Sequence, residues 1–176
     1  MSDFEAYRND ILFTFQKHKG MAEKAMVQLK DDLFFFPPGQ FSSSVAVIVK
    51  HLAGNLTSRW TDFLTCDGEK PTRNRDGEFV IGPDDSRDNL LALWEAGWGA
   101  LFGSLRELKE SDWLRTITIR GEPHSVMQAI HRSVAHVAYH TGQITYVSRM
   151  LQTGTWHWVT IPPGQSGSHP GKYLQA

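Results

Sequence analysis

Apolar residues recur every three or four positions in four long stretches of the chain, a spacing typical of amphipathic helices. These stretches cover residues 3–30, 42–65, 86–109 and 122–153. Serines stand at or just before the start of the first three, where they can cap a helix, and Pro123 suits the first turn of the fourth. The pattern predicts a mostly α protein built as a four-helix bundle.

The connecting segments have other patterns. Residues 114–121 alternate around β-branched positions and end in glycine, which predicts a short extended arm or hairpin before the last helix. Residues 31–40 predict a turn whose Leu-Phe-Phe-Phe run packs under the helices, and residues 66–85 predict a surface loop. Residues 152–176 predict an irregular, docked tail, and the length favours a single domain over residues 1–176.

The inward face of the last helix is apolar at its ends and polar in the middle. His136 and His140 share this face and lie about 6 Å apart along the axis. Such a pair is the usual helical half of a transition-metal site, and the plain alternative is two hydrogen-bonded or surface histidines. Gln143 on the same face favours the metal, which helps to satisfy a buried polar cluster. His131 projects from the opposite side, so a third ligand must come from elsewhere.

His51 is the candidate third ligand, because it sits in the middle of a polar row on the second helix, with Asn55 one turn further on. A solvent-facing histidine beside an exposed amide has the same pattern, and periodicity alone slightly favours that arrangement. Glu95 lies on the apolar face of the third helix, an unusual place for a carboxylate. It is expected either at the edge of the bundle or in the site.

Composition limits the possible partners. A net charge of −1, from 18 basic and 19 acidic residues, gives no reason to expect nucleic acid or an acidic membrane surface. No apolar run approaches the about 20 residues that span a bilayer, and the first residues do not resemble a secretory signal. The single cysteine, Cys66, cannot form an internal disulfide and suits a reducing cytoplasm, so a cytoplasmic protein is expected.

Two motifs together carry a resemblance to a known family. His51-Leu-Ala-Gly-Asn55, combined with His136-Val-Ala-Tyr-His140-Thr-Gly-Gln143, resembles the DinB-like superfamily of metal-binding four-helix proteins. The stretch from Thr116 to His124 resembles a poorly characterised branch of it, related to bacillithiol S-transferases. The resemblance implies a site in which His51, His136 and His140 bind a divalent metal, zinc or nickel most often, with positions open to water or substrate.

Related members include thiol-dependent S-transferases and a mycothiol-dependent maleylpyruvate isomerase. The resemblance therefore implies a metal-dependent enzyme of the thiol S-transferase or hydrolase type, which uses a metal-bound thiolate or hydroxide. An S-transferase would also use a low-molecular-weight thiol as a cofactor. Three neutral imidazoles leave a dication uncompensated, so a bound thiol would lose its proton and the pKa of a bound water would fall towards about 7. The alternative is a non-catalytic, metal-binding or stress-associated protein.

Roles for further residues follow from the same resemblance. Asn55 and Gln143 are expected to line the open face and orient water or substrate. Glu95 is expected to accept a proton from the second ring nitrogen of a ligand, or to act as a general base. Arg120 and Arg132 could hold an anionic substrate, and solvated arginines are the alternative for both.

Superfamily members often pair, so a homodimer is also expected. Ala135, Ala138 and Gly142 give the last helix a small-residue back face that a second helix could approach closely. A small-molecule substrate is the other expected partner, and its identity does not follow from the sequence.

Overall fold

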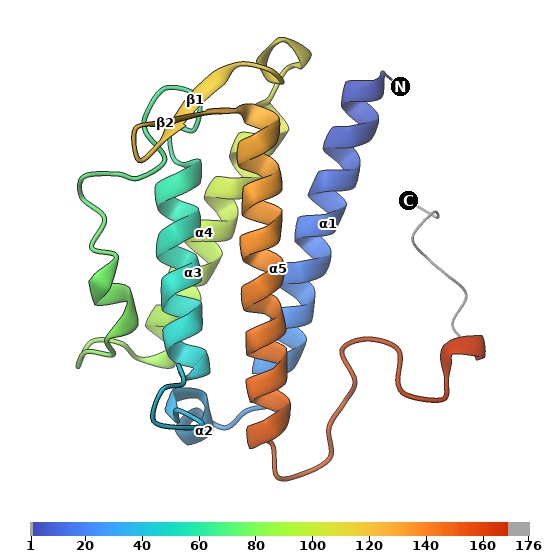
Figure 1. The fold of residues 1–176 in the computed structure, drawn as a ribbon. Coiled ribbons are helices and arrows are strands. Elements are labelled where there is room, and N and C mark those ends of the chain that lie inside the picture. The colour runs from blue at the N-terminus through green and yellow to red at the C-terminus, as the bar shows by residue number, and fades with distance from the viewer. Residues whose placement is uncertain (1, 169–176) are drawn as a thin grey trace.

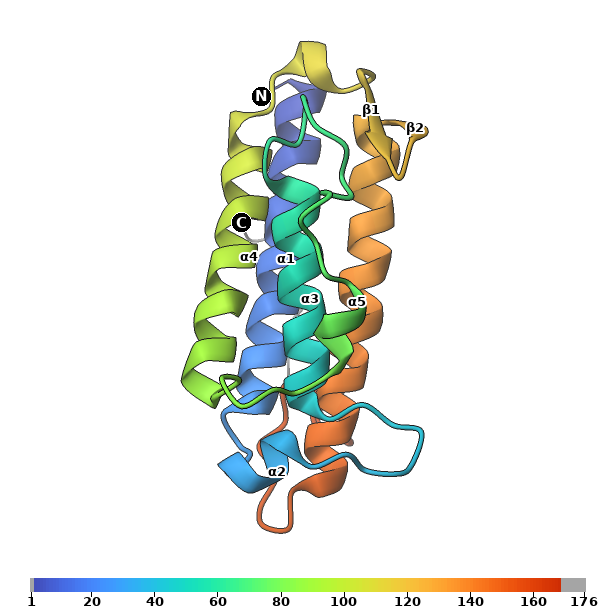
Figure 2. The ribbon, with the colours of Figure 1, turned by 90° about the vertical axis from the view of Figure 1, so that its left-hand side faces the viewer.

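The computed structural model describes residues 2–168, and over these residues the chain is mostly α-helical, as predicted. Four long helices lie side by side (Figures 1 and 2). They are α1 (Asp3–Met26), α3 (Val45–Trp60), α4 (Arg87–Glu107) and α5 (Val126–Leu151). A short helix, α2 (Asp31–Phe35), joins α1 to α3, and two short strands precede α5. Within the described range no helix combines the length and the apolar character that crossing a membrane needs.

Each long helix begins directly after a serine whose hydroxyl accepts a hydrogen bond from the backbone N–H three residues further on. These serines are Ser2, Ser44, Ser86 and Ser125. The prediction that Glu122 and Pro123 open the last helix is wrong, because both residues belong to a strand and α5 starts only after Ser125. The other helix ends differ from the predicted ones by a few residues.

The helices enclose a core of large apolar side chains. Phe15 of α1 lies edge-on to Trp60 of α3 and to Trp98 of α4, with ring centroids 6.4 and 6.3 Å apart, and all three side chains are buried. Helices α3 and α4 approach closely at Gly97, where a Cβ atom would lie 2.8 Å from the carbonyl oxygen of Ala53. The tight contact between α3 and α4 therefore depends on a residue without a side chain.

The path between α3 and α4 determines what lies beside α3. Both helices run in the same direction, so residues 61–86 must return along the whole length of the molecule (Figures 1 and 2). The return segment contains a 3₁₀ helix, η1 (Asp76–Phe79), which lies against α3. The predicted surface loop is therefore only partly right, because Glu78 in this segment is 7% exposed.

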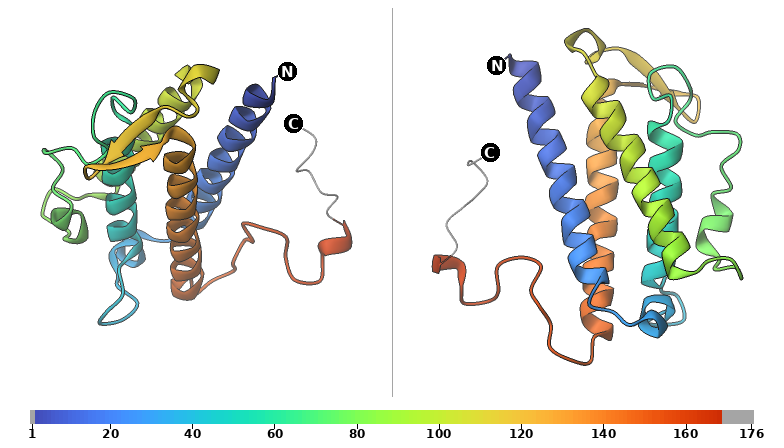
Figure 3. Two further views of the ribbon diagram at one scale, coloured as in Figure 1. Left: turned by 45° about the horizontal axis from the view of Figure 1, so that its top comes forward. Right: turned by 180° about the vertical axis from the view of Figure 1, so that it is seen from behind.

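The predicted arm before the last helix is an antiparallel hairpin across one end of the molecule (Figure 3), formed by β1 (Thr116–Ile119) and β2 (Glu122–Ser125). Its two-residue turn is Arg120-Gly121, and both residues have positive φ, 56° and 74°, as a type I′ turn requires. Asp67 fixes this turn to the return segment, since its carboxylate accepts hydrogen bonds from the backbone N–H groups of both turn residues, each at 2.8 Å.

The segments at the opposite end are partly packed. The prediction that the aromatic run packs under the helices is only partly right, because Phe34 is fully buried and Phe36 is 54% exposed. After α5 the chain is irregular, and Trp156 and Val159 pack against the core while His157 exchanges two backbone hydrogen bonds with the Gln28 side chain. The rest of the predicted tail, residues 169–176, lies outside the described residues.

Candidate metal centre

Two helices present three histidines to one point. His136 and His140 lie one turn apart on α5, and His51 faces them from α3. The Nε2 atom of His136 lies 3.4 Å from Nε2 of His51 and 3.1 Å from Nε2 of His140. The candidate ligand atoms of the three residues all lie within 4.8 Å of one another. The structure thus brings together the three histidines that the sequence suggested.

Hydrogen bonds to the other ring nitrogens determine the tautomers of two of these rings. The Nδ1–H group of His51 donates to the carboxylate of Glu78 at 2.8 Å, and that of His140 donates to the side-chain oxygen of Gln143 at 2.7 Å. Both Nε2 atoms then carry lone pairs directed at His136, whose Nε2–H could satisfy only one of them. A cation between the three nitrogens would satisfy all three lone pairs.

The spacing and the protonation state also fit a metal ion. Imidazole nitrogens bound tetrahedrally to zinc at 2.0–2.1 Å lie about 3.3–3.4 Å apart, close to the 3.4 and 3.1 Å that separate Nε2 of His136 from the other two. Burial, followed by the neighbouring histidines and Arg59, lowers the pKa of His136 to about 3. Burial likewise lowers the pKa of His140 to about 4. These two rings are therefore neutral at physiological pH, which is the form that binds metals.

The return segment supplies the support for His51. Glu78 accepts the Nδ1 hydrogen bond and also receives a bidentate pair from Arg73, whose Nε and Nη2 atoms lie 2.8 Å from its two oxygens. Burial alone would raise the pKa of Glu78, but these hydrogen bonds hold this pKa below its ordinary value, so the carboxylate is charged. The Phe79 ring packs against His51 at 4.7 Å between centroids. His51 is thus fixed in both tautomer and orientation.

Gly54 leaves room for this carboxylate. A Cβ atom at position 54 would lie 2.8 Å from Cδ of Glu78, closer than side chains approach one another. Glycine inside a helix is unfavourable, and the close approach of Glu78 explains why it stands here. This glycine, three residues after His51, was the one sequence signal for a neighbour beside the histidine.

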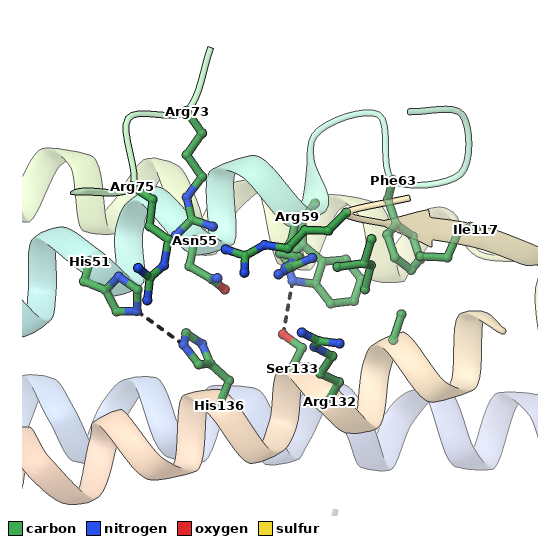
Figure 4. A pocket seen from close by; sticks show the side chains of 14 residues that line it. His51, Asn55, Arg59, Phe63, Arg73, Arg75, Ile117, Arg132, Ser133 and His136 are labelled. Atoms are coloured by element: carbon green, nitrogen blue, oxygen red, sulfur yellow. Dashed lines mark hydrogen bonds between the residues drawn. The ribbon is translucent and has the colours of Figure 1, made fainter. Parts of the chain in front are cut away.

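A pocket of about 220 Å³ opens beside the histidines. His51, Asn55 and His136 line one end, as Figure 4 shows, and Phe63 and Ile117 line the other. Five arginines also line the pocket: Arg59, Arg73, Arg75, Arg120 and Arg132. A small molecule in the pocket would therefore meet both the histidine cluster and a positively charged wall.

The other residues singled out from the sequence lie in different places. Asn55 is buried and lines the pocket, so it is placed for the expected contact with a guest. Gln143 does not line it, and instead fixes the ring of His140. Glu95 is not brought to the histidines, because its side chain is 62% exposed on α4 and pairs with Lys19 of α1 at 2.8 Å. Glu78, not Glu95, accepts the hydrogen bond from the second ring nitrogen of a candidate ligand, His51. His131 bonds to Tyr7 away from the cluster.

The fold and these residues define a mostly helical protein with a three-histidine candidate metal centre beside a pocket. Comparison with known families identifies it further: residues 3–165 match a family described as "Protein of unknown function (DUF1572)". The chain belongs to this family. The search of curated proteins found no match, and neither did the search of solved structures.

Proposed function

We propose that this protein is a four-helix bundle of the DinB-like type whose histidines 51, 136 and 140 bind a divalent metal, zinc or nickel, in a cytoplasmic enzyme. The observation that carries the proposal is the convergence of three Nε2 atoms beside a pocket, with separations of 3.1 and 3.4 Å to His136. Two of the rings are held from behind by Glu78 and Gln143, as is usual for metal-binding histidines.

The reaction that this site supports best is attack by a thiol or a water on a small electrophilic or hydrolysable substrate. A divalent metal held by neutral imidazoles lowers the pKa of a thiol or water bound to it and so supplies a nucleophile near neutral pH. The chain itself contributes the binding geometry. Asn55 offers an amide donor and acceptor to the guest beside His51, and the walls of the pocket limit the water around it.

Metal content is the first test. His136→Ala should lose most of the bound metal in elemental analysis of protein loaded with zinc or nickel. His131→Ala is the matched control, because this histidine is on the same helix but bonds to Tyr7 outside the cluster, and it should keep the metal. Equal metal content in the two variants would remove the proposed site.

Activity is the second test. Metal-loaded protein should conjugate monochlorobimane with a low-molecular-weight thiol, or hydrolyse a member of an ester and amide panel, and His136→Ala should not. Metal binding without turnover of any of these would support the alternative, a non-catalytic metal-binding protein. Absence of metal binding would refute both.

A further inference from the structure

The five arginines of the pocket come from four separate parts of the chain. Arg59 belongs to α3, Arg73 and Arg75 to the return segment, Arg120 to the hairpin turn and Arg132 to α5. Like charges repel, so such a cluster is unfavourable unless anions lie among them. Whether the pocket has unbalanced positive charge therefore depends on how many carboxylates pair with the five guanidinium groups.

Three carboxylates pair with these arginines among the described residues. Glu78 pairs with Arg73 at 2.8 Å. Glu69 lies 3.1 Å from Arg73, 3.4 Å from Arg120 and 3.7 Å from Arg59. Exposed Asp76 lies 3.8 Å from Arg75. The five guanidinium groups therefore outnumber by two the carboxylates that form ion pairs with them.

Arg59 shows the deficit most directly. Its side chain is 13% exposed, and its Nη1 atom is buried without a hydrogen-bond partner. Burial, and then the positive charge of Arg132, lower the pKa of Arg59 to about 10. A buried guanidinium group with an unpaired N–H is costly, and because Arg59 lines the pocket, an anion there would offset its positive charge.

Arg132 approaches the same space from the opposite side. It belongs to α5, next to Ser133 and one turn before His136, and Figure 4 shows it across the pocket from Arg59 and Arg75. Within the described part of the chain its hydrogen-bond partner is His124 at 3.3 Å, a group without negative charge. Guanidinium groups on facing walls can hold the two ends, or the several oxygens, of one anion.

We propose that the pocket binds a small organic dianion, with its acidic groups on Arg59, Arg75 and Arg132. Its apolar part would lie against Phe63 and Ile117. A volume of about 220 Å³ favours a ligand smaller than a drug-sized one, since pockets for drug-sized ligands measure about 300–1,000 Å³. The ligand is the substrate if the proposed metal-dependent function holds, because the pocket ends at His51 and His136.

Binding of defined anions to zinc-loaded protein tests the charge requirement by calorimetry. Succinate and phenyl phosphate are the dianionic probes and distinguish carboxylate from phosphate chemistry, while succinamate carries one charge and succinamide none. The better dianion should bind at least about tenfold more tightly than succinamate, since each lost charge-assisted contact is worth more than 1.4 kcal/mol. Equal affinity for charged and neutral probes would overturn the proposal.

Arginine variants test the location. Arg132→Gln and Arg59→Met should each weaken binding of the better dianion by about tenfold or more. Arg106→Gln is the control, because Arg106 packs on Phe102 of α4 and does not line the pocket, and its affinity should match wild type. Unchanged affinity in Arg132→Gln, once a melting curve has shown that this variant is folded, would refute the assignment.

His136→Ala separates this inference from the proposed metal site. An anion held by the arginines should still bind measurably to the metal-poor variant. If binding disappears with the metal and is unaffected by the arginine variants, the anion is a ligand of the metal alone and the arginine pocket is refuted. If wild type binds no metal but binds the dianion, the metal site fails and the anion pocket stands.

Discussion

Replacing Glu78 by glutamine changes the support of His51 with almost no change of shape. The carboxylate accepts from Nδ1–H of His51 and from two nitrogen atoms of Arg73, and all of these groups are donors. A glutamine has one accepting oxygen and an NH₂ group. His51 and Nη2 of Arg73 share one oxygen of Glu78, and Nε of Arg73 contacts the other. Arg73 therefore loses a contact in either orientation of the amide, whereas His51 keeps an acceptor in one of them.

The expected effect is on metal affinity. Loss of a partner behind a metal-binding histidine lowers affinity about 10–100-fold, which corresponds to about 1.4–2.7 kcal/mol. The lower part of this range is expected, because the amide orientation that keeps more hydrogen bonds leaves an oxygen at His51, and the change there is the loss of the negative charge. The fold should persist, since Arg73 keeps its contacts with Glu69 at 3.1 and 3.3 Å.

Competition with a chromogenic zinc chelator at neutral pH measures the affinity. Glu69→Gln is the matched control, because this residue also contacts Arg73 but does not touch the histidines. It should bind zinc within about threefold of wild type, as expected for a group that does not contact a metal ligand. Similar losses in the two variants would show that the carboxylate acts through the general stability of the return segment, and the argument about His51 would be wrong.

Two further substitutions test neighbouring parts of the structure. Gly54→Ala should lower zinc affinity in the same chelator assay by about tenfold, because its Cβ displaces Glu78 from His51. Asp67→Asn should destabilise the protein by about 1 kcal/mol in neutral denaturant titrations, since the two turn N–H groups bond to different carboxylate oxygens and an amide has only one acceptor. Burial alone would raise the pKa of Asp67, but the hydrogen bonds to the backbone lower this pKa from its ordinary 3.8. The difference in unfolding free energy between wild type and variant should therefore be full above pH 3.8 and shrink below it. A difference that grows with acidity would contradict this.

Helical periodicity alone was enough to predict the part of the candidate site that lies on α5. Residues four apart on a helix share a face whatever surrounds it, so His136 and His140 could be paired from spacing alone. The same arithmetic placed His131 outside the cluster, as the structure has it. His51 needed a resemblance as well, because a polar row on one helix does not say which other helix it faces.

Glu95 shows the limit of this reasoning. Its helix position is shared with apolar residues, but a glutamate side chain is long enough to leave the face, and here it is 62% exposed and pairs with Lys19 of α1. An angle around a helix axis specifies a direction and not how far the neighbouring helix extends. The hairpin shows a similar limit of sequence reasoning. Pro123 suits the start of a helix as well as a short strand, and its pairing with Thr118 in the fold makes it part of a strand.

Arg73 and Glu78 could not be found by periodicity, because they lie in an irregular segment. Their place beside His51 follows from the topology: α3 and α4 run in the same direction, so the chain between them must pass back along α3 (Figure 2). A shorter, antiparallel connection would leave no segment in contact with the outer side of His51. The site therefore depends on the length of the return segment, residues 61–86. Because it is long enough to pass along α3, this one segment both fixes a candidate ligand, His51, and supplies two arginines to the pocket.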